Sequence, residues 1–371
     1  MVVKNGLVFV ENLGFQKKNV EIKDGLFTRI VDEDISGDEV IDASGCYVIP
    51  GLVDVHLHAA VGHDFCDEDD KGLSEILKYE LKSGITSLCP TSMTFPEDKL
   101  SRVFETIAGH KGADDEADII GINMEGPFIA EKKKGAQKAD YIRNPDVDMF
   151  LRLQDKAKGL IKLCDIAPEN PGGMEFIKAL KDKVVISIAH TDADYETAME
   201  AFKNGAWHVT HLYNAMNGFT HRAPGVVGAV SDCDGVYAEL ICDGVHINPA
   251  SVRATFKMLG DDRIVLISDS MMAAGLDAGQ YELGGQEVFV HGNKATLADG
   301  TIAGSVTNLM NCMKTLVKEM DIPLESAVKC ATIIPARSIG VEDKVGSIEV
   351  GKKGDLVILD KDLEIVRVIK S

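Results

Sequence analysis

Tryptophan is nearly absent from this 371-residue chain, which contains one, and no apolar run reaches the ~18 residues that a membrane-spanning helix needs. Positive charge is also scarce. The 39 lysines and arginines face 59 aspartates and glutamates, which gives a formal net charge of −20. This balance argues against nucleic acid or an anionic membrane as a partner, because phosphate groups are bound by basic surfaces. An anionic substrate would have to be held by a local positive site.

The eight cysteines form no CxxC pair, and several lie within apolar, strand-like runs. We interpret them as reduced, buried thiols of a cytosolic protein. Residues 1–20 also lack the pattern of a secretory signal peptide. The sequence therefore predicts a cytoplasmic protein.

The length exceeds what one small core requires and suits a (β/α)8 TIM-like barrel, typically about 250 residues, plus a smaller domain. Strand-like and helix-like stretches alternate through the middle of the chain, and the 35 glycines suit many tight turns. The predicted strands span residues 53–58, 85–89, 118–125, 160–166, 184–190, 208–211, 236–242 and 263–268. Eight such strands predict an α/β barrel, with an open doubly wound sheet as the alternative.

Both ends of the chain differ from this middle part. Residues 1–50 and 336–371 are predicted to form short strands separated by turn signals such as Asp24–Gly25. We expect one small β-sandwich domain assembled from both termini, with the barrel spanning residues 51–335. Residues 281–305 are predicted to form a β-hairpin excursion over the mouth of the barrel.

The stretch GLVDVHLH, residues 51–58, ends an apolar run with two histidines at i and i+2. His56 and His58 would project to the same side of a strand, which suits a divalent metal. Further ligand or acid/base residues end other predicted strands, namely Glu125, His190, His211 and Asp269. Barrel active sites lie at the carboxyl ends of the strands. The sequence therefore predicts a metal centre at that end.

Motifs along almost the whole chain resemble those of the amidohydrolase superfamily, and specifically of the N-acetylglucosamine-6-phosphate deacetylase family. They are PGLVDVHLH (50–58), MEGPF (124–128), AHT (189–191), THLYNAMN (210–217), HRAPG (221–225), DGVH (243–246), SDS (268–270), IAGS (302–305) and GSIEVGKKGDLVILD (346–360). The resemblance implies metal-dependent hydrolysis of N-acetylglucosamine 6-phosphate to glucosamine 6-phosphate and acetate. Two alternatives stay open: another acetylated amino-sugar phosphate, such as N-acetylgalactosamine 6-phosphate, and a non-catalytic scaffold. A non-catalytic scaffold would be expected to have lost some of the metal-ligating residues.

The resemblance also implies a ligand set in which Glu125, His190 and His211 hold the principal metal. His56 and His58 would hold a second ion, with Glu125 as the bridge. Many superfamily relatives bridge with a modified lysine on strand four, but here that strand ends LCDIAPE without one. Some members lack the first histidine pair, so one or two ions per subunit are expected. Zinc, iron, manganese and cobalt all suit imidazole and carboxylate ligands.

Catalytic and substrate-contacting roles follow from the same resemblance. Asp269 is expected to act as general base and then general acid. The expected substrate contacts are Asn214 and Ala215 through backbone amides to the phosphate, Arg222 to the phosphate, His246, and Ile302, Ala303, Gly304 and Ser305 around the acetyl group. Gln137 stands where some relatives carry a sugar-contacting histidine, and because glutamine can still donate a hydrogen bond, we expect it to contact a ring hydroxyl. Asn123 stands where a histidine is expected. The family also implies a homodimer.

Overall fold

The computed structural model describes residues 1–371, and its centre is a barrel of parallel strands. The strands are β6 (Leu52–Leu57), β9 (Ile85–Ser92), β10 (Asp118–Ile119), β11 (Ile122–Met124), β12 (Ile161–Ile166), β13 (Val185–Ile188), β14 (Ala206–Val209), β15 (Tyr237–Ile241) and β16 (Ile264–Ile267). Neighbours pair in parallel from β6 through to β16. The backbone N–H of Asp269, just after β16, donates to the carbonyl oxygen of His56 on β6 at 2.9 Å. The predicted (β/α)8 barrel is confirmed, and the third predicted strand divides into β10 and β11.

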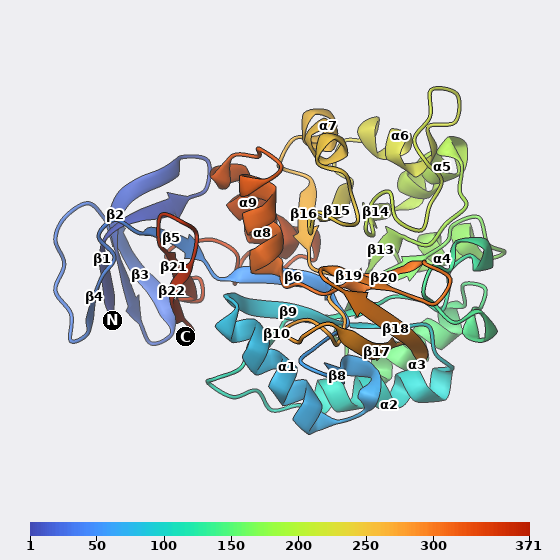
Figure 1. Ribbon diagram of the computed structural model, residues 1–371, viewed down its shortest axis with the longest axis horizontal. Coiled ribbons are helices and arrows are strands. Elements are labelled where there is room, and N and C mark those ends of the chain that lie inside the picture. Colours follow the sequence, from blue (N-terminus) through green and yellow to red (C-terminus); the bar gives the residue numbers. More distant parts are fainter.

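Helices surround this barrel (Figure 1). They are α1 (Asp70–Lys82), α2 (Glu97–Gly109), α3 (Val147–Lys156), α4 (Gly173–Leu180), α5 (Tyr195–Asn204), α6 (Gly225–Ser231), α7 (Pro249–Leu259), α8 (Leu309–Lys318), α9 (Leu324–Ala331) and α10 (Ile333–Ser338). Three short 3₁₀ helices are η1 (Phe65–Asp67), η2 (Glu131–Lys133) and η3 (Ala139–Tyr141). None of the helices is both long and apolar enough to cross a membrane.

The local sequence explains where several helices begin. The side chains of Asp69, Asp146 and Asp194 accept backbone N–H groups in the first turns of α1, α3 and α5. Such caps satisfy donors that have no partner within the helix. The barrel strands β6, β9 and β16 are buried throughout. Strands of a parallel sheet that is covered by helices are expected to be buried on both faces.

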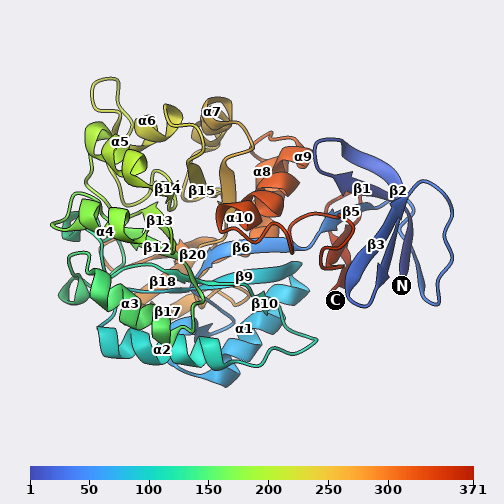
Figure 2. The ribbon, with the colours of Figure 1, turned by 180° about the vertical axis from the view of Figure 1, so that it is seen from behind.

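A second sheet brings the two ends of the chain together (Figures 1 and 2). Its strands are β1 (Val2–Val10), β2 (Gly14–Lys23), β3 (Leu26–Val31), β4 (Val40–Asp42), β5 (Tyr47–Pro50), β21 (Leu356–Leu359) and β22 (Ile365–Ile369), in the order β22-β21-β5-β1-β2-β3 with β4 beside β1. Val8, Phe27 and Leu356 belong to one buried apolar cluster of this sheet. The predicted small β-domain built from both termini is confirmed. We propose its boundaries with the barrel at residues 50/51 and 335/336.

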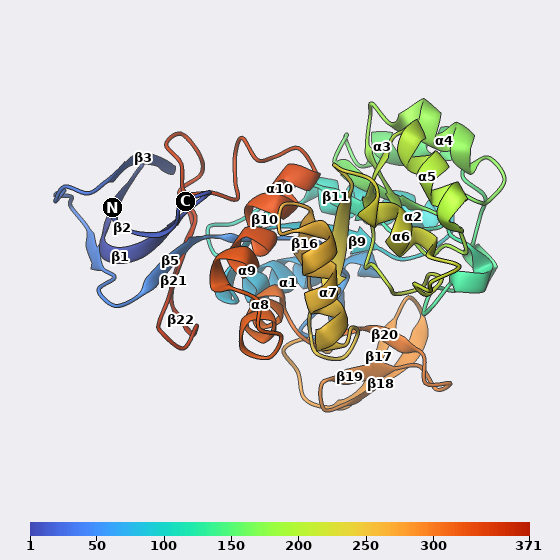
Figure 3. The ribbon, with the colours of Figure 1, turned by 90° about the horizontal axis from the view of Figure 1, so that it is seen from above.

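A third sheet follows the last barrel strand. It is antiparallel and consists of β17 (Gly279–Leu283), β18 (Gln286–His291), β19 (Lys294–Thr296) and β20 (Ile302–Ser305). Figure 3 shows it, in orange, projecting to one side of the barrel. A small pair, β7 (Ala59–Ala60) and β8 (His63–Asp64), follows β6. The predicted excursion is present, and its last strand contacts the segment that carries Asp269.

Candidate metal centre

Three of the predicted ligands meet at the carboxyl ends of β11, β13 and β14. Glu125 Oε1 lies 3.1 Å from Nε2 of His190 and 3.1 Å from Nε2 of His211, and the two Nε2 atoms are 3.2 Å apart. Oxygen and nitrogen ligands bind a catalytic metal at about 2.0–2.2 Å. Two ligand atoms that bind the same ion are then separated by roughly 3 Å. The three atoms are therefore spaced as they would be if they bound one ion.

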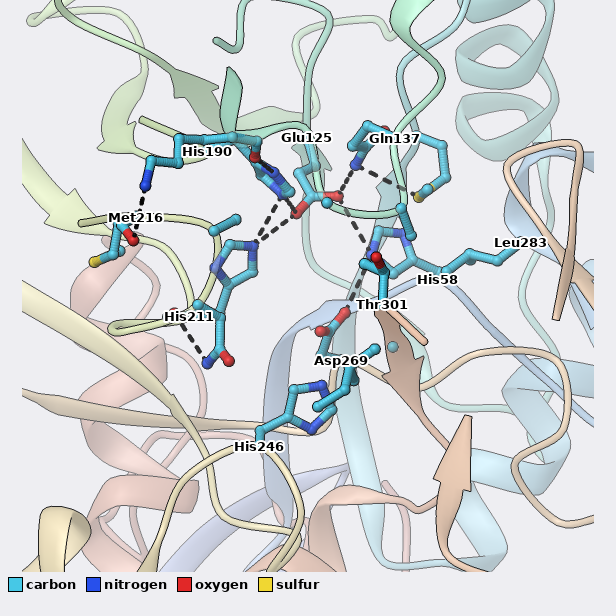
Figure 4. A pocket seen from close by; sticks show the side chains of 18 of the residues that line it. His58, Glu125, Gln137, His190, His211, Met216, His246, Asp269, Leu283 and Thr301 are labelled. Carbon is cyan, nitrogen blue, oxygen red and sulfur yellow. Dashed lines mark hydrogen bonds and ion pairs between the residues drawn. The ribbon is translucent and has the colours of Figure 1, made fainter. Parts of the chain in front are cut away.

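His58 lies on the other side of the same carboxylate from His190 and His211 (Figure 4), and the ring of His56 is next to it, with centroids 5.3 Å apart. Nε2 of His56 is 3.6 Å from Glu125 Oε1, and Nε2 of His58 is 3.5 Å from Glu125 Oε2. Two groups of three ligand atoms can therefore be formed, and Glu125 belongs to both. The arrangement is suited to a bridging carboxylate between two ions.

Neighbouring groups fix how three of the imidazoles are turned. Nδ1 of His190 donates to the carbonyl oxygen of Lys133 at 2.8 Å, and Nδ1 of His58 lies 3.3 Å from the carbonyl oxygen of Thr91. Nδ1 of His56 lies 2.9 Å from Oε2 of Glu239. Acceptors at Nδ1 keep the proton there and leave Nε2 as the ligand atom. Nε2 of His56 is buried without a hydrogen-bond partner, and a metal ion in this position would satisfy it.

The electrostatics of the cluster also suit a cation. Burial alone would lower the pKa of His56, but the carboxylates of Glu239, Glu125 and Asp269 raise it well above its usual range. Burial opposes the ionisation of Glu125, yet hydrogen bonds from His190 and His211 lower its pKa well below normal. The buried carboxylates thus favour positive charge among the histidines, which a divalent cation supplies.

Three site residues have a left-handed backbone, with φ of 43° at His190, 29° at His211 and 50° at Asp269. Each follows the end of a barrel strand, and none is glycine. This conformation costs on the order of 1–3 kcal/mol per residue and persists where the surrounding structure requires it. The turn past the strand end lets these side chains enter the cluster.

Asp269 lies beside the first histidine pair and is 8% exposed. Its Oδ1 is 3.3 Å from Nε2 of His58 and 3.7 Å from Nε2 of His56. Although burial opposes it, the hydrogen bond and positive charge of these histidines lower the pKa of Asp269 below its usual value. The carboxylate is therefore ionised at neutral pH and faces both the ligands and the cavity above them.

A cavity of about 440 Å³ opens onto the cluster. Its walls include most of the predicted substrate-contacting residues, namely Gln137, Asn214, Ala215, His246, Ile302 and Gly304. Three predicted residues do not line it. Ala303 and Ser305 are buried behind Ile302 and Gly304, and Ser305 exchanges backbone hydrogen bonds with Asp269 and Met271. Arg222 is exposed and lines a separate hollow beside Asn217.

Two polar residues of the cavity wall are held by carboxylate partners. Nδ1 of His246 lies 2.8 Å from Oδ2 of Asp243, so its Nε2 is directed away from that partner. Burial opposes protonation of His246, but Asp243 raises its pKa above the usual value. Gln137 donates to Glu125 Oε2 and accepts the backbone N–H of Thr94 at 2.7 Å. Gln137 thus holds the bridging carboxylate as well as facing the cavity.

Sequence reasoning missed Glu239. Its side chain is fully buried, and its Oε2 lies 2.9 Å from Nδ1 of His56. A charged residue within the apolar run of strand seven was the available signal for Glu239. Asn123, the other departure, is buried and donates to the carbonyl oxygen of Val55 at 3.2 Å.

Comparisons with known proteins agree with this geometry. The family model of the amidohydrolase family matches residues 47–371. An N-acetylglucosamine-6-phosphate deacetylase of Bacillus subtilis is 35% identical over 377 residues, covering 100% of this chain and 95% of its own length. One of Bos taurus is 32% identical over 376 residues, covering 98% of this chain and 91% of its own length.

Two solved structures are also similar over the whole chain. N-acetylglucosamine-6-phosphate deacetylase from Pasteurella multocida has a TM-score of 0.93 at 30% identity, covering 100% of this chain and 97% of that one. A mutant of the Mycobacterium smegmatis deacetylase in complex with N-acetyl-D-glucosamine-6-phosphate has the same TM-score, identity and coverage. The chain belongs to the amidohydrolase family and, within it, to the N-acetylglucosamine-6-phosphate deacetylases.

Proposed function

We propose that this protein hydrolyses the acetyl amide of N-acetylglucosamine 6-phosphate, giving glucosamine 6-phosphate and acetate. The observation that carries this proposal is the convergence of Glu125, His190, His211 and Asp269 at the floor of one cavity. Full-length similarity to deacetylases of that name supports the substrate. The scaffold alternative is disfavoured because every expected ligand is present and close to its partners.

Glu125, His190 and His211 are proposed to hold the principal divalent metal, and His56 and His58 a second one. A bound metal would acidify a water molecule and polarise the acetyl carbonyl. The Nδ1 partners of His190, His58 and His56 keep these three imidazoles turned so that Nε2 can bind the metal. Zinc, iron, manganese and cobalt are all compatible with these ligands.

Asp269 is proposed to move the proton. Its carboxylate lies beside the first histidine pair and faces the cavity, so it takes a proton from the attacking water. The same carboxyl group then delivers that proton to the amide nitrogen, which leaves as the amine. His246, turned by Asp243, lies beside Asp269 in the cavity wall (Figure 4) and is proposed to donate to a sugar oxygen.

The remaining substrate contacts are proposed from the shape of the cavity. Ile302 and Gly304 border the acetyl group directly, whereas Ala303 and Ser305 fix the position of that strand from behind. Gly304 has a φ of 66°, and a Cβ there would lie 3.1 Å from the carbonyl oxygen of Asp269. The predicted phosphate contacts of Asn214, Ala215 and Arg222 are kept as proposals. The backbone N–H of Asn214 donates to the carbonyl oxygen of His211 at 2.9 Å, so the amide proposed to meet the phosphate is that of Ala215.

A substrate panel tests the activity. Metal-analysed enzyme should deacetylate N-acetylglucosamine 6-phosphate in preference to N-acetylgalactosamine 6-phosphate and to both unphosphorylated sugars. The Asp269→Asn enzyme, with equal metal content, controls for contaminating activity. A preference for the galactosamine series would establish the alternative substrate, and no hydrolysis of any acetylated sugar by the metal-loaded enzyme would reject the activity.

We also propose a cytoplasmic homodimer that acts without nucleic acid or a membrane. All eight cysteines are free, as is usual in a reducing compartment. The net charge of −20 disfavours polyanionic partners. Light scattering of the metal-loaded enzyme measures the oligomeric state, and a monomer at micromolar concentration would contradict the dimer.

A further inference from the structure

A second hollow, of about 290 Å³, lies at the end of the barrel opposite the metal centre. Its walls include residues from the beginnings of three barrel strands, namely Val185 of β13, Trp207 of β14 and Tyr237 of β15. His190 and His211 follow the other ends of β13 and β14, so the strands themselves separate the hollow from the metal centre. The deacetylation proposed above uses no residue of this hollow.

The hollow is positively charged, although the whole chain carries a net charge of −20. Lys162, Lys181 and Lys183 line it, and Asp182 is its only acidic residue. Three lysines and one aspartate give these walls a formal charge of +2. None of the three lysines has a carboxylate oxygen within 4.0 Å of its Nζ atom. Their charge is therefore available to an anionic ligand.

The stems of two of these lysines lie against glycines. A Cβ at Gly205 would be 2.8 Å from Cβ and 2.8 Å from Cδ of Lys181, and a Cβ at Gly121 would be 2.5 Å from Cγ of Lys162. The absence of a side chain at both glycines thus lets the lysine stems pack directly on the backbone. Gly205 is two residues before Trp207, so Lys181 is placed next to the strand that carries the indole.

The aromatic wall of the hollow is unusually open. Trp207 is the only tryptophan of the chain, and it is 48% exposed, although tryptophan is highly buried on average in folded proteins. Tyr237 is half-buried and lines the same hollow. Neither the indole N–H nor the phenol hydroxyl has a hydrogen-bond partner within the chain. A flat ring stacked on Trp207 would cover apolar surface that water otherwise contacts.

We propose that this hollow binds a nucleoside 5′-phosphate, with the base against Trp207 and the phosphate on Lys181 and Lys183. An aromatic side chain accepts any base, because every base has a π face. Ammonium groups bind phosphate oxygens through charge-assisted hydrogen bonds. The two features side by side select a ligand that carries both a planar ring and a phosphate. The ligand is a single nucleotide and not a nucleic acid, because the chain as a whole is acidic.

The single tryptophan allows binding to be measured at the hollow itself, without turnover. Titration of metal-loaded enzyme with adenosine 5′-monophosphate should change the emission of Trp207 to saturation, and equilibrium dialysis should give the same Kd. Adenosine lacks the phosphate and inorganic phosphate lacks the base, so each should bind at least about fourfold more weakly. Saturating glucosamine 6-phosphate should leave the Kd of adenosine 5′-monophosphate unchanged, because the two ligands bind at opposite ends of the barrel.

Two sets of variants separate the aromatic wall from the charge. Trp207→Leu, measured by dialysis, should raise the Kd of adenosine 5′-monophosphate about 5- to 150-fold, the range for stacking of one base. The double variant Lys181→Met, Lys183→Met should raise it about 4- to 25-fold, since each exposed charge contributes about two- to fivefold. Lys178→Met with Lys203→Met is the matched control, because both lysines are exposed and neither lines the hollow.

The absence of saturable binding of adenosine 5′-monophosphate would overturn the nucleotide site, as would equal effects of the two double variants. Displacement of the nucleotide by glucosamine 6-phosphate would place it at the metal centre instead. Inorganic phosphate that binds as tightly as adenosine 5′-monophosphate would show that the aromatic wall has no role. An emission of Trp207 that changes with enzyme concentration and not with the nucleotide would mean that a second copy of the chain covers the hollow, and would also overturn the site.

Discussion

The carboxylate of Glu239 accepts a hydrogen bond from Nδ1 of His56 at 2.9 Å, and both side chains are fully buried. The same oxygen, Oε2, accepts the backbone N–H of His211 at 3.0 Å. One carboxylate therefore orients a ligand of the first histidine pair and positions the backbone of a ligand from the other group. Glu239 connects the two halves of the centre, although it faces neither the cavity nor a predicted metal.

Glu239→Gln should weaken metal binding about 10- to 100-fold, the usual effect of losing a group that orients a ligand. The amide keeps the size of the side chain but accepts less strongly and places a donor against His56 or His211. Metal content after dialysis against graded chelator measures the effect. Glu80→Gln is the control, because Glu80 is equally buried and contacts no predicted ligand. Equal metal retention by wild type and Glu239→Gln would contradict the role.

The double variant His56→Gln, His58→Asn should lose the second ion and keep the first. Glu125, His190 and His211 remain within 3.2 Å of one another and form a complete three-ligand site. Elemental analysis should give one ion per subunit in the variant. Loss of all metal would show that the histidine pair belongs to a single shared site.

Asp269→Asn should keep metal and substrate binding and lower kcat about 10²- to 10⁴-fold, the usual contribution of a general acid–base group. The amide cannot accept a proton, but it preserves the size of the side chain beside His58. Turnover together with binding of N-acetylglucosamine 6-phosphate separates the two effects. A kcat near that of the wild type would reject the assignment of Asp269.

The sequence predicted the barrel, its strands and the residues that meet at its rim, because each of these is encoded locally. Apolar runs mark strands, and His190, His211 and Asp269 directly follow them. Contacts between distant segments were harder to predict. Glu239 is 183 residues from His56 in the chain, and nothing in either stretch specifies their pairing.

The error in the predicted substrate residues has a different, local cause. The segment 302–305 was predicted as one unit, yet side chains on a strand alternate between its faces. Ile302 and Gly304 therefore face the cavity, while Ala303 and Ser305 lie behind it.

Gly126→Ala should destabilise the protein and lower its activity more than Gly159→Ala does. The two glycines have φ of 80° and 81°, so an added Cβ strains the backbone equally. At Gly126 that Cβ would also lie 2.1 Å from Oγ1 of Thr94, whereas at Gly159 it meets nothing within 4 Å. Relief of that clash would shift Glu125, the preceding residue. Thermal unfolding and kcat of both variants test the difference, and equal effects would contradict it.

Glu80→Gln should raise the thermal stability of the protein at neutral pH. Glu80 is fully buried on α1, and neither carboxylate oxygen has a protein hydrogen-bond partner. Burial, followed by the nearby charge of Asp54, raises the pKa of Glu80 well above its usual value. The folded protein thus keeps a proton that the unfolded chain releases above about pH 4.3. The contribution of Glu80 to the free energy of unfolding is therefore fully present at low pH, and it is lost as the pH rises toward the pKa of Glu80 in the folded protein.

Glutamine cannot ionise, so the Glu80→Gln variant does not lose stability in this way as the pH rises. The difference in Tm between Glu80→Gln and wild type should be small near pH 4.5 and should grow in favour of the variant toward pH 8. Melting curves of the metal-loaded enzyme across this range test the sign. Leu77→Ala, on the same buried face of α1, is the control, because its destabilisation should not depend on the ionisation of Glu80. A Tm difference that grows as pH falls would mean that Glu80 is ionised in the folded protein.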